Sequence, residues 1–273
     1  MLLRGGEEAD IDWLLDLGAG LPWLDIKRLY LYPKSKVKIA MSLHQLEKIW
    51  TSYLDDHVPL QYLLGKCPWR DFELEVNQDV LIPRQETELM LEFALTKFDN
   101  QTKGVWVDLG TGSGALAVGL ARTFPFWKGH AVDSSEAALE IAKRNVDKLS
   151  GDSQVSFHLG RWWQPLSPYF EFFDLVLANP PYIPSELMDQ LNPLVRENEP
   201  YLALCGGIDG LDHIREIIFG SFDALSAGGW LILEHHYDQN EKVLELMFDA
   251  GLEDIGFEKD LNGIKRFAIG RRP

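Results

Sequence analysis

From residue 104 onward, short apolar runs alternate with longer stretches whose apolar residues recur at helical spacing. Such alternation predicts β-α-β units, which build a parallel sheet with helices on both faces. The larger part of the chain is therefore expected to be an α/β domain. The expected strands are 105–109, 130–133, 155–159, 174–178 and 230–235, and the expected helices between them are 114–123, 135–149, 208–226 and 238–250.

The carboxyl-terminal residues break this alternation. From residue 252 the chain reads LEDIGFEKD, then a turn at Leu261-Asn262-Gly263, then IKRFAIG. Two short strands joined by Asn-Gly predict a hairpin, because these residues readily adopt the positive φ that a tight hairpin turn requires. The sheet is therefore expected to be mostly parallel and to end in an antiparallel strand pair.

The amino-terminal residues have a helical pattern. Three stretches within residues 1–66 carry apolar residues at helical spacing. Ser42 followed by Gln45 has the pattern of a capping box, which predicts a helix over 42–56. The inward face of this helix should carry Leu43, Leu46, Ile49, Trp50, Tyr53 and Leu54.

Residues 67–84 connect this helical part to the α/β part. Apolar residues alternate with acids over 72–76, a polar turn follows at 77–79, and an apolar run returns over 80–82. This pattern predicts a β-hairpin, with a helix over 85–99 after it. We therefore expect a helical domain (1–66), a β-hairpin linker (67–84) and an α/β domain (85–273).

Charge and composition narrow the function classes. The chain of 273 residues has a formal net charge of −16, which disfavours stable binding to a phosphate backbone. Lys34, Lys36 and Lys38 come nearest to a basic run, and we interpret them as a solvated turn. Cys67 and Cys205 lie far apart with no C-x-x-C pattern, so no metal site is expected. No apolar stretch approaches the ~18 residues of a membrane span and no signal peptide is evident, so we expect a cytoplasmic protein.

A glycine-rich turn follows the first strand of the α/β domain, in VWVDLGTGSGALAVGLA. Gly110, Gly112 and Gly114 let the backbone turn tightly and approach a ligand without a Cβ in the way. The following helix would present free backbone N–H groups to that ligand. In dinucleotide folds this place binds pyrophosphate. Asp108, at the end of the strand, disfavours a phosphate and favours a cation, which makes a dehydrogenase the weakest interpretation.

The next two strand ends carry groups that suit a nucleoside. Asp133 lies 23 residues after Gly110, where a carboxylate can accept both ribose hydroxyls; its alternative role is to cap the next helix. Trp162 is expected against an adenine face and Trp163 in the core, although the sequence does not decide between them. Adenosine that carries a cationic sulfonium and no phosphate fits these groups, and S-adenosylmethionine is that ligand.

The apolar strand 174–178 ends abruptly in Asn179-Pro180-Pro181-Tyr182. Because the carboxyl ends of parallel strands line the ligand crevice, Asn179 is expected to face the methyl donor. The Asn179 side-chain carbonyl and the Pro180 backbone carbonyl can together accept both N–H bonds of one planar NH₂ group. Tyr182 would clamp the acceptor, and the prolines would hold these groups in place for in-line transfer. The simpler alternative is a rigid turn.

In this order, DLGTGSGALA, AVD, GRWWQPL and LANPPYI resemble class I methyltransferases that act on planar NH₂ groups, including DNA adenine-N6 and RNA guanine-N2 enzymes. The flanks VPLQYLLGKCPWRDFELEVNQDVLIPRQETELM and VRENEPYLALCGGIDGLDHIREI resemble the HemK/PrmC family of protein-(glutamine-N5) methyltransferases. This resemblance covers roughly residues 55–270. It implies a Rossmann-like class I S-adenosylmethionine-dependent methyltransferase fold, a helical domain that recognises the substrate, and methylation of the Gly-Gly-Gln glutamine of class I peptide chain release factors. A monomer is expected.

The residues and the resemblance together assign three sets of site residues, with no metal ligand among them. Cofactor binding is assigned to Asp108, Gly110, Thr111, Gly112, Ser113, Gly114, Asp133, Trp162 and Asn179. Substrate binding is assigned to Asn179, Pro180, Pro181, Tyr182, Arg84 and Glu86, and catalysis to Asn179, Pro180 and Tyr182. For Arg84 and Glu86, a surface turn is the alternative.

The chain departs from the family pattern at Gln85, Asn198, Arg161 and His235-His236, none of which belongs to the expected acceptor clamp. Two other functions remain open. The first is an amino methyltransferase that acts on nucleic acid, which the acidic charge disfavours. The second is a non-catalytic nucleotide-binding module that docks on a release factor.

Overall fold

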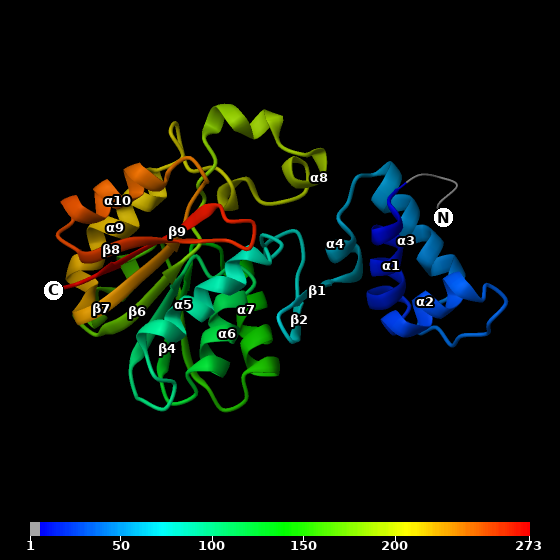
Figure 1. Ribbon diagram of the computed structural model, residues 1–273, viewed down its shortest axis with the longest axis horizontal. Helices are drawn as coiled ribbons and strands as arrows, with labels where there is room; N and C mark the ends of the chain where they lie inside the picture. Colours follow the sequence, from blue (N-terminus) through cyan, green and yellow to red (C-terminus); the bar gives the residue numbers. More distant parts are fainter. Residues whose placement is uncertain (1–5) are drawn as a thin grey trace.

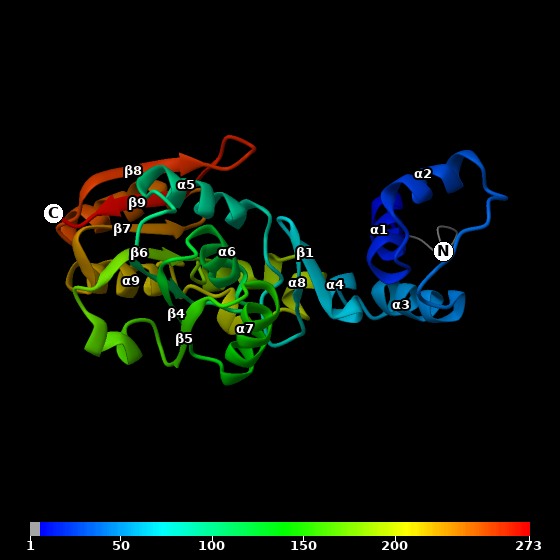
Figure 2. The same ribbon diagram turned by 90° about the horizontal axis from the view of Figure 1, so that it is seen from below.

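The computed structural model describes residues 6–273 and shows a small helical part joined by a hairpin to a larger α/β part (Figure 1). Met1–Gly5 lie outside the described residues. The expected helical domain (1–66) begins with them, and the expectation that the chain has no signal peptide also concerns them. Figure 2 shows the hairpin β1–β2 between the two parts. Within residues 6–273, no helix is both long and apolar enough to cross a membrane.

The α/β part is built on a seven-stranded sheet with the order β5-β4-β3-β6-β7-β9-β8. Its strands are β3 (Val105–Leu109), β4 (Lys128–Asp133), β5 (Gln154–Leu159), β6 (Phe173–Ala178), β7 (Leu225–Glu234), β8 (Glu253–Lys259) and β9 (Lys265–Arg271). The pairs from β5 to β7 are parallel, and β9 runs antiparallel to both β7 and β8. The predicted parallel sheet that ends in an antiparallel hairpin is confirmed.

Helices cover both faces of this sheet, as the alternating pattern predicts. They are α5 (Leu89–Lys97), α6 (Ala115–Thr123), α7 (Glu136–Leu149), α9 (Asp212–Ala224) and α10 (Asn240–Asp249). The buried residues of α5, α6 and α7 share one hydrophobic cluster with Trp106 and Leu177. Those of α9 and α10 share a second cluster with Val107 and Val176. Successive residues of β3 and β6 thus alternate between the two faces, as the strand pleat requires.

The helical part has a hydrophobic core of its own, centred on Leu14, Ile26, Leu46 and Trp50. Its elements are α1 (Glu8–Trp13), a π-helical turn η2 (Leu14–Gly18), α2 (Trp23–Leu31), α3 (Leu43–Asp55) and α4 (Leu60–Leu64). The predicted capping box forms at the start of α3, where the Ser42 side chain accepts from the Gln45 backbone N–H and the Gln45 side chain accepts from the Ser42 N–H. The inward position expected for Leu43 is wrong, because this side chain is 68% exposed.

The linker hairpin has a different register from the expected one. Strand β1 (Lys66–Trp69) pairs with β2 (Phe72–Glu75) through a tight turn in which Arg70 has a φ of 53°. The expected return strand over 80–82 is wrong. The Val80 carbonyl accepts from the Tyr62 hydroxyl at 2.6 Å, and the Val80 N–H donates to the Asn77 carbonyl. These bonds hold 77–80 as a turn that is tied to α4 instead of as a strand.

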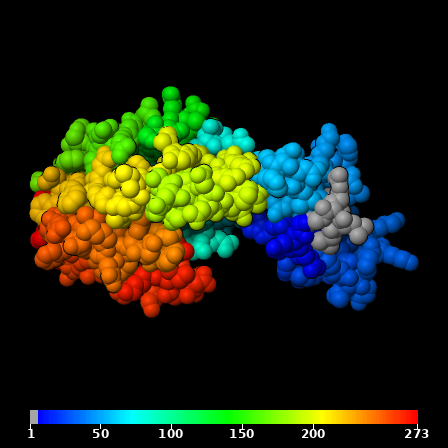
Figure 3. Space-filling model, turned by 90° about the horizontal axis from the view of Figure 1, so that it is seen from above, coloured from blue at the N-terminus to red at the C-terminus, as the bar shows by residue number. Residues whose placement is uncertain are grey.

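Several boundaries also differ from the predicted ones. The helix expected over 85–99 begins as a 3₁₀ turn, η3 (Glu86–Glu88), before α5, and the helix expected from 208 begins only at Asp212. Sequence periodicity does not reveal the short turns η4 (Gln164–Tyr169), η5 (Ser185–Gln190), α8 (Pro193–Arg196) and η6 (Tyr201–Ala203). Figure 3 shows the yellow-green segment that contains η5, α8 and η6 reaching the light-blue helical part. There Asn198 Nδ2 donates to the His57 carbonyl at 2.7 Å.

Candidate active site

A cavity of about 640 Å³ opens where β3, β4, β5 and β6 end at their carboxyl termini. Residues at or just after the end of each of these strands line it, namely Gly110 and Gly112, Asp133, Gly160 and Asn179. Residues 78–81 of the linker and 200–203 after β6 close its sides. Adjacent parallel strands end at one edge of the sheet, so their ends converge on this crevice.

The glycine turn forms the floor of this larger cavity. Gly112 has a φ of +54°, and a Cβ placed there would meet no atom within 4 Å, so the space above it is open. Gly114 has a φ of +82°, and its Cβ would lie 2.9 Å from the backbone of Ala142, so close packing on α7 requires glycine here. Thr111, Ser113 and Gly114 do not line the cavity. They hold the turn from behind, where the Gly114 N–H donates to the Thr111 carbonyl.

Asp133 ties two segments of the cavity together. Its Oδ2 accepts from the Gly112 N–H and its Oδ1 from the Ser135 N–H, both at 2.9 Å. The role of helix cap belongs to Ser135, whose hydroxyl accepts from the Ala138 N–H at the start of α7. Burial raises the pKa of Asp133, and its backbone hydrogen bonds oppose that shift. Each carboxylate oxygen keeps a second lone pair, so Asp133 can still accept two hydroxyl groups of a ligand.

Asp108 lies beneath the glycine turn and does not line the cavity. Its Oδ2 accepts from the Thr111 hydroxyl at 2.7 Å, and its buried Oδ1 has no hydrogen-bond partner among residues 6–273. Burial, with the nearby charge of Asp133 as a smaller cause, raises the pKa of Asp108 to about 7. An unpaired buried carboxylate oxygen under an open glycine turn suits a cationic ligand, since a positive charge nearby would favour the ionised form.

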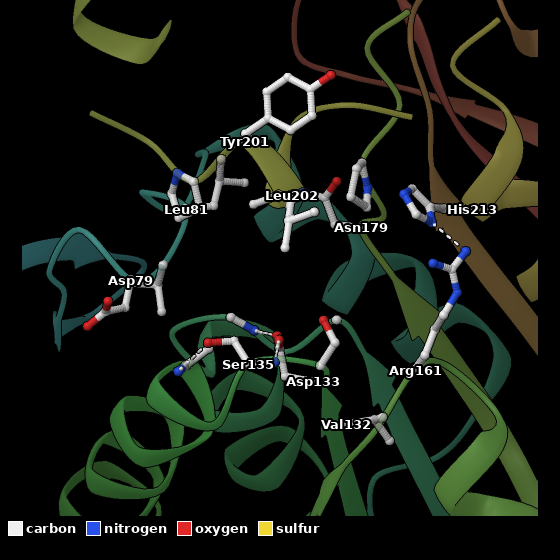
Figure 4. A pocket seen from close by; sticks show the side chains of 18 of the residues that line it. Asp79, Leu81, Val132, Asp133, Ser135, Arg161, Asn179, Tyr201, Leu202 and His213 are labelled. Atoms are coloured by element: carbon white, nitrogen blue, oxygen red, sulfur yellow. Dashed lines mark hydrogen bonds between the residues drawn. The ribbon is translucent and has the colours of Figure 1, made fainter. Parts of the chain in front are cut away.

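The two tryptophans after β5 have separate places. Trp162 lines the larger cavity with a φ of 46°, next to Gly110. Trp163 lies in the core, where its Nε1–H donates to the Ile217 carbonyl at 3.1 Å. On the same wall, Arg161 contacts His213 at 3.3 Å, and both line the cavity (Figure 4).

A smaller cavity of about 200 Å³ adjoins the first and shares Asn179 with it. Apolar side chains form most of its wall, together with Arg84, Pro180 and Tyr182. Pro181 faces the larger cavity instead. Figure 4 shows Asn179 and Leu202 on the wall opposite Asp133 and Ser135. Asn179 therefore stands at the point where the two cavities meet.

Asn179 belongs to a hydrogen-bond chain that sequence reasoning missed. Its Nδ2 donates to the Thr87 hydroxyl at 3.0 Å, and that hydroxyl donates to Glu234 Oε2 at 2.6 Å. The Tyr182 hydroxyl donates to Glu234 Oε1 at 3.2 Å, and burial raises the pKa of Tyr182 well above its ordinary value. The sequence does contain a signal for Glu234, since it is a carboxylate that ends an apolar strand, as Asp133 does.

The two substrate residues expected near the end of the linker, Arg84 and Glu86, have different surroundings. Arg84 lines the smaller cavity, and its Nη2 donates to both oxygens of Glu199 at 2.8 and 2.9 Å. Glu199 is 6% exposed; its burial raises its pKa, and the charge of Arg84 opposes that shift. Glu86 lines neither cavity. The structure thus brings Arg84 to the site and leaves Glu86 outside it.

These residues fit S-adenosylmethionine. Gly112 leaves open space for a ligand, Asp133 offers free lone pairs, Trp162 offers an aromatic side chain, and Asp108 has a buried oxygen nearby that no group within residues 6–273 hydrogen-bonds. A volume of about 640 Å³ is also within the range of small-molecule sites. In residues 6–273, no group of three or more His, Cys, Asp or Glu side chains is placed to hold a metal ion.

Comparisons with known proteins agree with this geometry. Residues 86–207 match the family model described as "Methyltransferase small domain". The chain is 52% identical to a "Release factor glutamine methyltransferase" of Prochlorococcus marinus, over 100% of this chain and 94% of that protein. It is 38% identical to a protein of the same name from Synechocystis, over 99% of this chain and 92% of that protein.

Among solved structures, the catalytic domain of hMettl16 in complex with a MAT2A 3′UTR hairpin superposes with a TM-score of 0.59. It is 15% identical and covers 84% of this chain and 80% of that one, so this likeness concerns the fold alone. The fold is that of the class I S-adenosylmethionine-dependent methyltransferases. Given the full-length identity to its curated relatives, the chain belongs to the family of release factor glutamine methyltransferases.

Proposed function

We propose that this chain transfers a methyl group from S-adenosylmethionine to the side-chain amide nitrogen (N5) of the glutamine in the Gly-Gly-Gln motif of class I peptide chain release factors. Its family membership and the names of its relatives support this activity. The observation that carries the proposal is that Asn179 lines both cavities, so one side chain can contact the methyl donor and the acceptor together.

The larger cavity, hereafter the donor cavity, would hold S-adenosylmethionine, which supplies a methyl group on a cationic sulfonium. Asp133 would accept the ribose hydroxyls, and Trp162 would lie against the adenine. Gly110 and Gly112 would let the backbone approach the ligand, with Thr111, Ser113 and Gly114 shaping the turn. Burial raises the pKa of Asp108 below the turn, and a bound cation would favour its ionised form.

The smaller cavity, hereafter the acceptor cavity, would hold the substrate glutamine. Asn179 Oδ1 and the Pro180 carbonyl would each accept one N–H of its amide, and Pro181 and Tyr182 would hold the loop and the side chain in place. An amide nitrogen is a weak nucleophile because its lone pair is delocalised. Binding both hydrogens would orient the nitrogen, so that the new C–N bond forms as the bond between the methyl group and the sulfonium sulfur breaks; the nitrogen then loses one proton. The N-methylated amide cation is acidic, so this loss requires no strong base.

Recognition of the whole release factor would involve the helical domain (1–66), separated by the linker (67–84) from the methyltransferase domain (85–273). Helix α2 exposes Trp23, Leu24 and Leu31, with Tyr32 just beyond its end. Such a group of exposed apolar side chains suits contact with another protein. Arg84 would shape the mouth of the acceptor cavity, and Glu86 would act outside it. We further propose a cytoplasmic monomer that does not bind nucleic acid stably.

Label transfer tests this proposal directly. Purified protein and methyl-labelled S-adenosylmethionine are incubated with an unmodified release factor, with its Gly-Gly-Ala variant, and with duplex DNA. We expect label on the intact release factor alone. Label on DNA would indicate a nucleic-acid amino methyltransferase, and tight donor binding without any transfer would indicate a non-catalytic module. Either result would overturn the proposed function.

A further inference from the structure

The site contains a buried carboxylate that touches neither cavity. Glu234, the last residue of β7, is 2% exposed and lines neither the donor nor the acceptor cavity. Both of its oxygens accept hydrogen bonds, one from Thr87 and one from Tyr182. Burying a carboxylate is costly unless its lone pairs are used. A carboxylate at this place therefore invites a functional explanation.

The hydrogen bonds from Glu234 to Asn179 have a defined direction. A carboxylate only accepts, so the single proton of the Thr87 hydroxyl is directed to Glu234 Oε2. Towards Asn179 the Thr87 oxygen can then only accept, and the side-chain atom 3.0 Å away is Nδ2. The Asn179 amide is thereby oriented with Oδ1 away from Thr87. Burial raises the pKa of Glu234, and the hydroxyls of Thr87 and Tyr182 and the charge of Arg266 oppose that shift.

We propose that Glu234 and Thr87 are positioning residues that fix which end of the Asn179 amide meets the substrate glutamine. This inference rests on the proposed function, because it concerns the orientation of the same acceptor clamp. With Oδ1 towards the substrate, Asn179 accepts an N–H and leaves the nucleophilic nitrogen free. With the amide reversed, Nδ2 would donate to that nitrogen and occupy the lone pair that attacks the methyl group.

The fold explains how such distant residues meet. Strands β6 and β7 are parallel neighbours, with Ala178 opposite Leu233, so Asn179 and Glu234 leave the sheet side by side. Thr87 comes from η3, just after the linker, and its hydroxyl reaches both residues. The Thr87–Glu234 hydrogen bond thus also holds the segment after Arg84 against the sheet. One carboxylate organises the hydroxyl of Tyr182 and the amide of Asn179 together.

Three variants test the proposal through activity. Thr87→Val removes the hydroxyl at constant shape, Thr87→Ser keeps it, and Glu234→Gln replaces the carboxylate with a group that both donates and accepts. We expect kcat to fall by about 10–100-fold in Thr87→Val and Glu234→Gln, with the Kd for S-adenosylmethionine changed less than about twofold. Thr87→Ser should keep most of the wild-type kcat, because it keeps the hydroxyl. The control is Thr96→Val, which also loses a hydroxyl hydrogen bond but lies on the exposed side of α5.

A double variant separates positioning from a general structural role. If Glu234 acts through Thr87, the double variant Thr87→Val/Glu234→Gln should have about the same kcat as the less active of the two single variants, because both changes break the same chain of hydrogen bonds. Glu234→Gln can lower Tm, because the Thr87–Glu234 hydrogen bond also holds the segment after Arg84, but kcat measured well below Tm should still fall by about 10–100-fold. The proposal would be overturned if the kcat losses of the two single variants multiplied in the double variant. It would also be overturned if kcat fell only in step with Tm and Thr87→Ser were as impaired as Thr87→Val.

A measurement without substrate makes this test independent of the proposed function. In asparagine-selectively ¹⁵N-labelled protein, the side-chain NH₂ signals of Asn179 are identified by their absence in Asn179→Asp. We expect slow solvent exchange of these protons in the wild type and in Thr96→Val, and faster exchange in Thr87→Val and Glu234→Gln. Unchanged exchange would overturn the positioning role even if methylation is observed. Faster exchange in a protein that does not methylate release factors would support the role and overturn the function.

Discussion

The donor cavity and the acceptor clamp are assembled in different ways. The floor of the donor cavity is made by two short segments, residues 108–114 and 133–135, in which the Gly112 and Ser135 N–H groups bind Asp133 directly. The acceptor side is made by side chains that come from distant parts of the chain, and Thr87 and Glu234 are 147 residues apart. Changes on the donor side should therefore affect cofactor affinity, whereas changes on the acceptor side should affect turnover.

The largest effect should come from Asn179, a polar residue that lines both cavities. Asn179→Ala removes the carbonyl that accepts a substrate N–H, and we expect kcat to fall by about 100–1,000-fold, as when a donor that stabilises a transition state is removed. The Kd for S-adenosylmethionine should change less than about threefold, because Asp133 and the glycine turn are untouched. Turnover of methyl-labelled release factor and calorimetric binding of the cofactor give the two values.

Asn262→Ala, in the exposed turn between β8 and β9, is the matched control and should behave as wild type. If Asn179→Ala kept turnover within about threefold of the wild type, the acceptor clamp would have to lie elsewhere.

A change on the donor side should produce the reverse pattern. Asp133→Ala removes the acceptor of the Gly112 and Ser135 N–H groups and the group proposed to bind ribose. Hydrogen bonds to a charged group are worth about 1.5–3 kcal/mol, so we expect the Kd for S-adenosylmethionine to rise by about 10–100-fold. At saturating cofactor, kcat should recover to within about fivefold of wild type.

Asp79→Asn controls for the loss of one negative charge in this prediction, because Asp79 lines the same cavity. Equal losses of affinity in both variants would mean that Asp133 acts only through its charge.

The same contrast explains what could be predicted from the sequence. Strand periodicity and the glycine turn predict a parallel sheet. Because parallel strands end at one edge, the sequence also predicts that Gly112, Asp133 and Asn179 lie together there, where the larger cavity is. The capping box of α3 is equally local, since Ser42 and Gln45 satisfy each other within one turn.

Features that depend on tertiary contacts were not predictable in this way. The linker register depends on the Tyr62 hydroxyl. It donates to the Val80 carbonyl, which is therefore engaged by a side chain instead of by a neighbouring strand. Periodicity does not mark the 3₁₀ turns after β6, which are held by bonds such as Ile183 N–H to the Leu204 carbonyl. Thr87 and Glu234 pair only because β6, β7 and η3 meet, and the sequence alone does not show that meeting.

A smaller effect should arise far from both cavities, on helix α2. Leu24 is 82% exposed, so Leu24→Glu should leave folding intact. If α2 contacts the release factor, we expect KM for the protein substrate to rise by about 3–10-fold, with KM for S-adenosylmethionine unchanged, since truncated contacts at an interface typically cost about 1 kcal/mol or somewhat more. Steady-state kinetics with each substrate varied in turn measure both constants.

Phe248→Glu on α10, another exposed apolar residue, introduces the same charge on the α/β part (Figure 1). An equal rise of KM in this control would trace the effect to general repulsion rather than to contact with α2.

The smallest effect should be a pH dependence of cofactor binding that originates at Asp108. Its pKa in the folded protein is about 7, raised mainly by burial, against about 3.8 for the unfolded chain. The folded state therefore holds an extra proton between these values, and the stability this contributes is present below pH 3.8 and lost as the pH rises through 7. A cationic ligand favours the ionised carboxylate, so binding below pH 7 must release that proton.

We therefore expect the affinity for S-adenosylmethionine to rise by less than about tenfold between pH 6 and pH 8, because one pKa unit corresponds to about 1.4 kcal/mol. Asp108→Asn should bind with little pH dependence, and its Tm should fall less than that of wild type over the same range. Calorimetry in buffers of different ionisation enthalpy measures the released proton. His213 lines the same cavity, and burial lowers its pKa below the ordinary value of a histidine. If the affinity of Asp108→Asn for S-adenosylmethionine changed with pH as steeply as that of the wild type, the released proton would have to come from another group. Asp108 would then not be the ionised group that favours the cationic ligand.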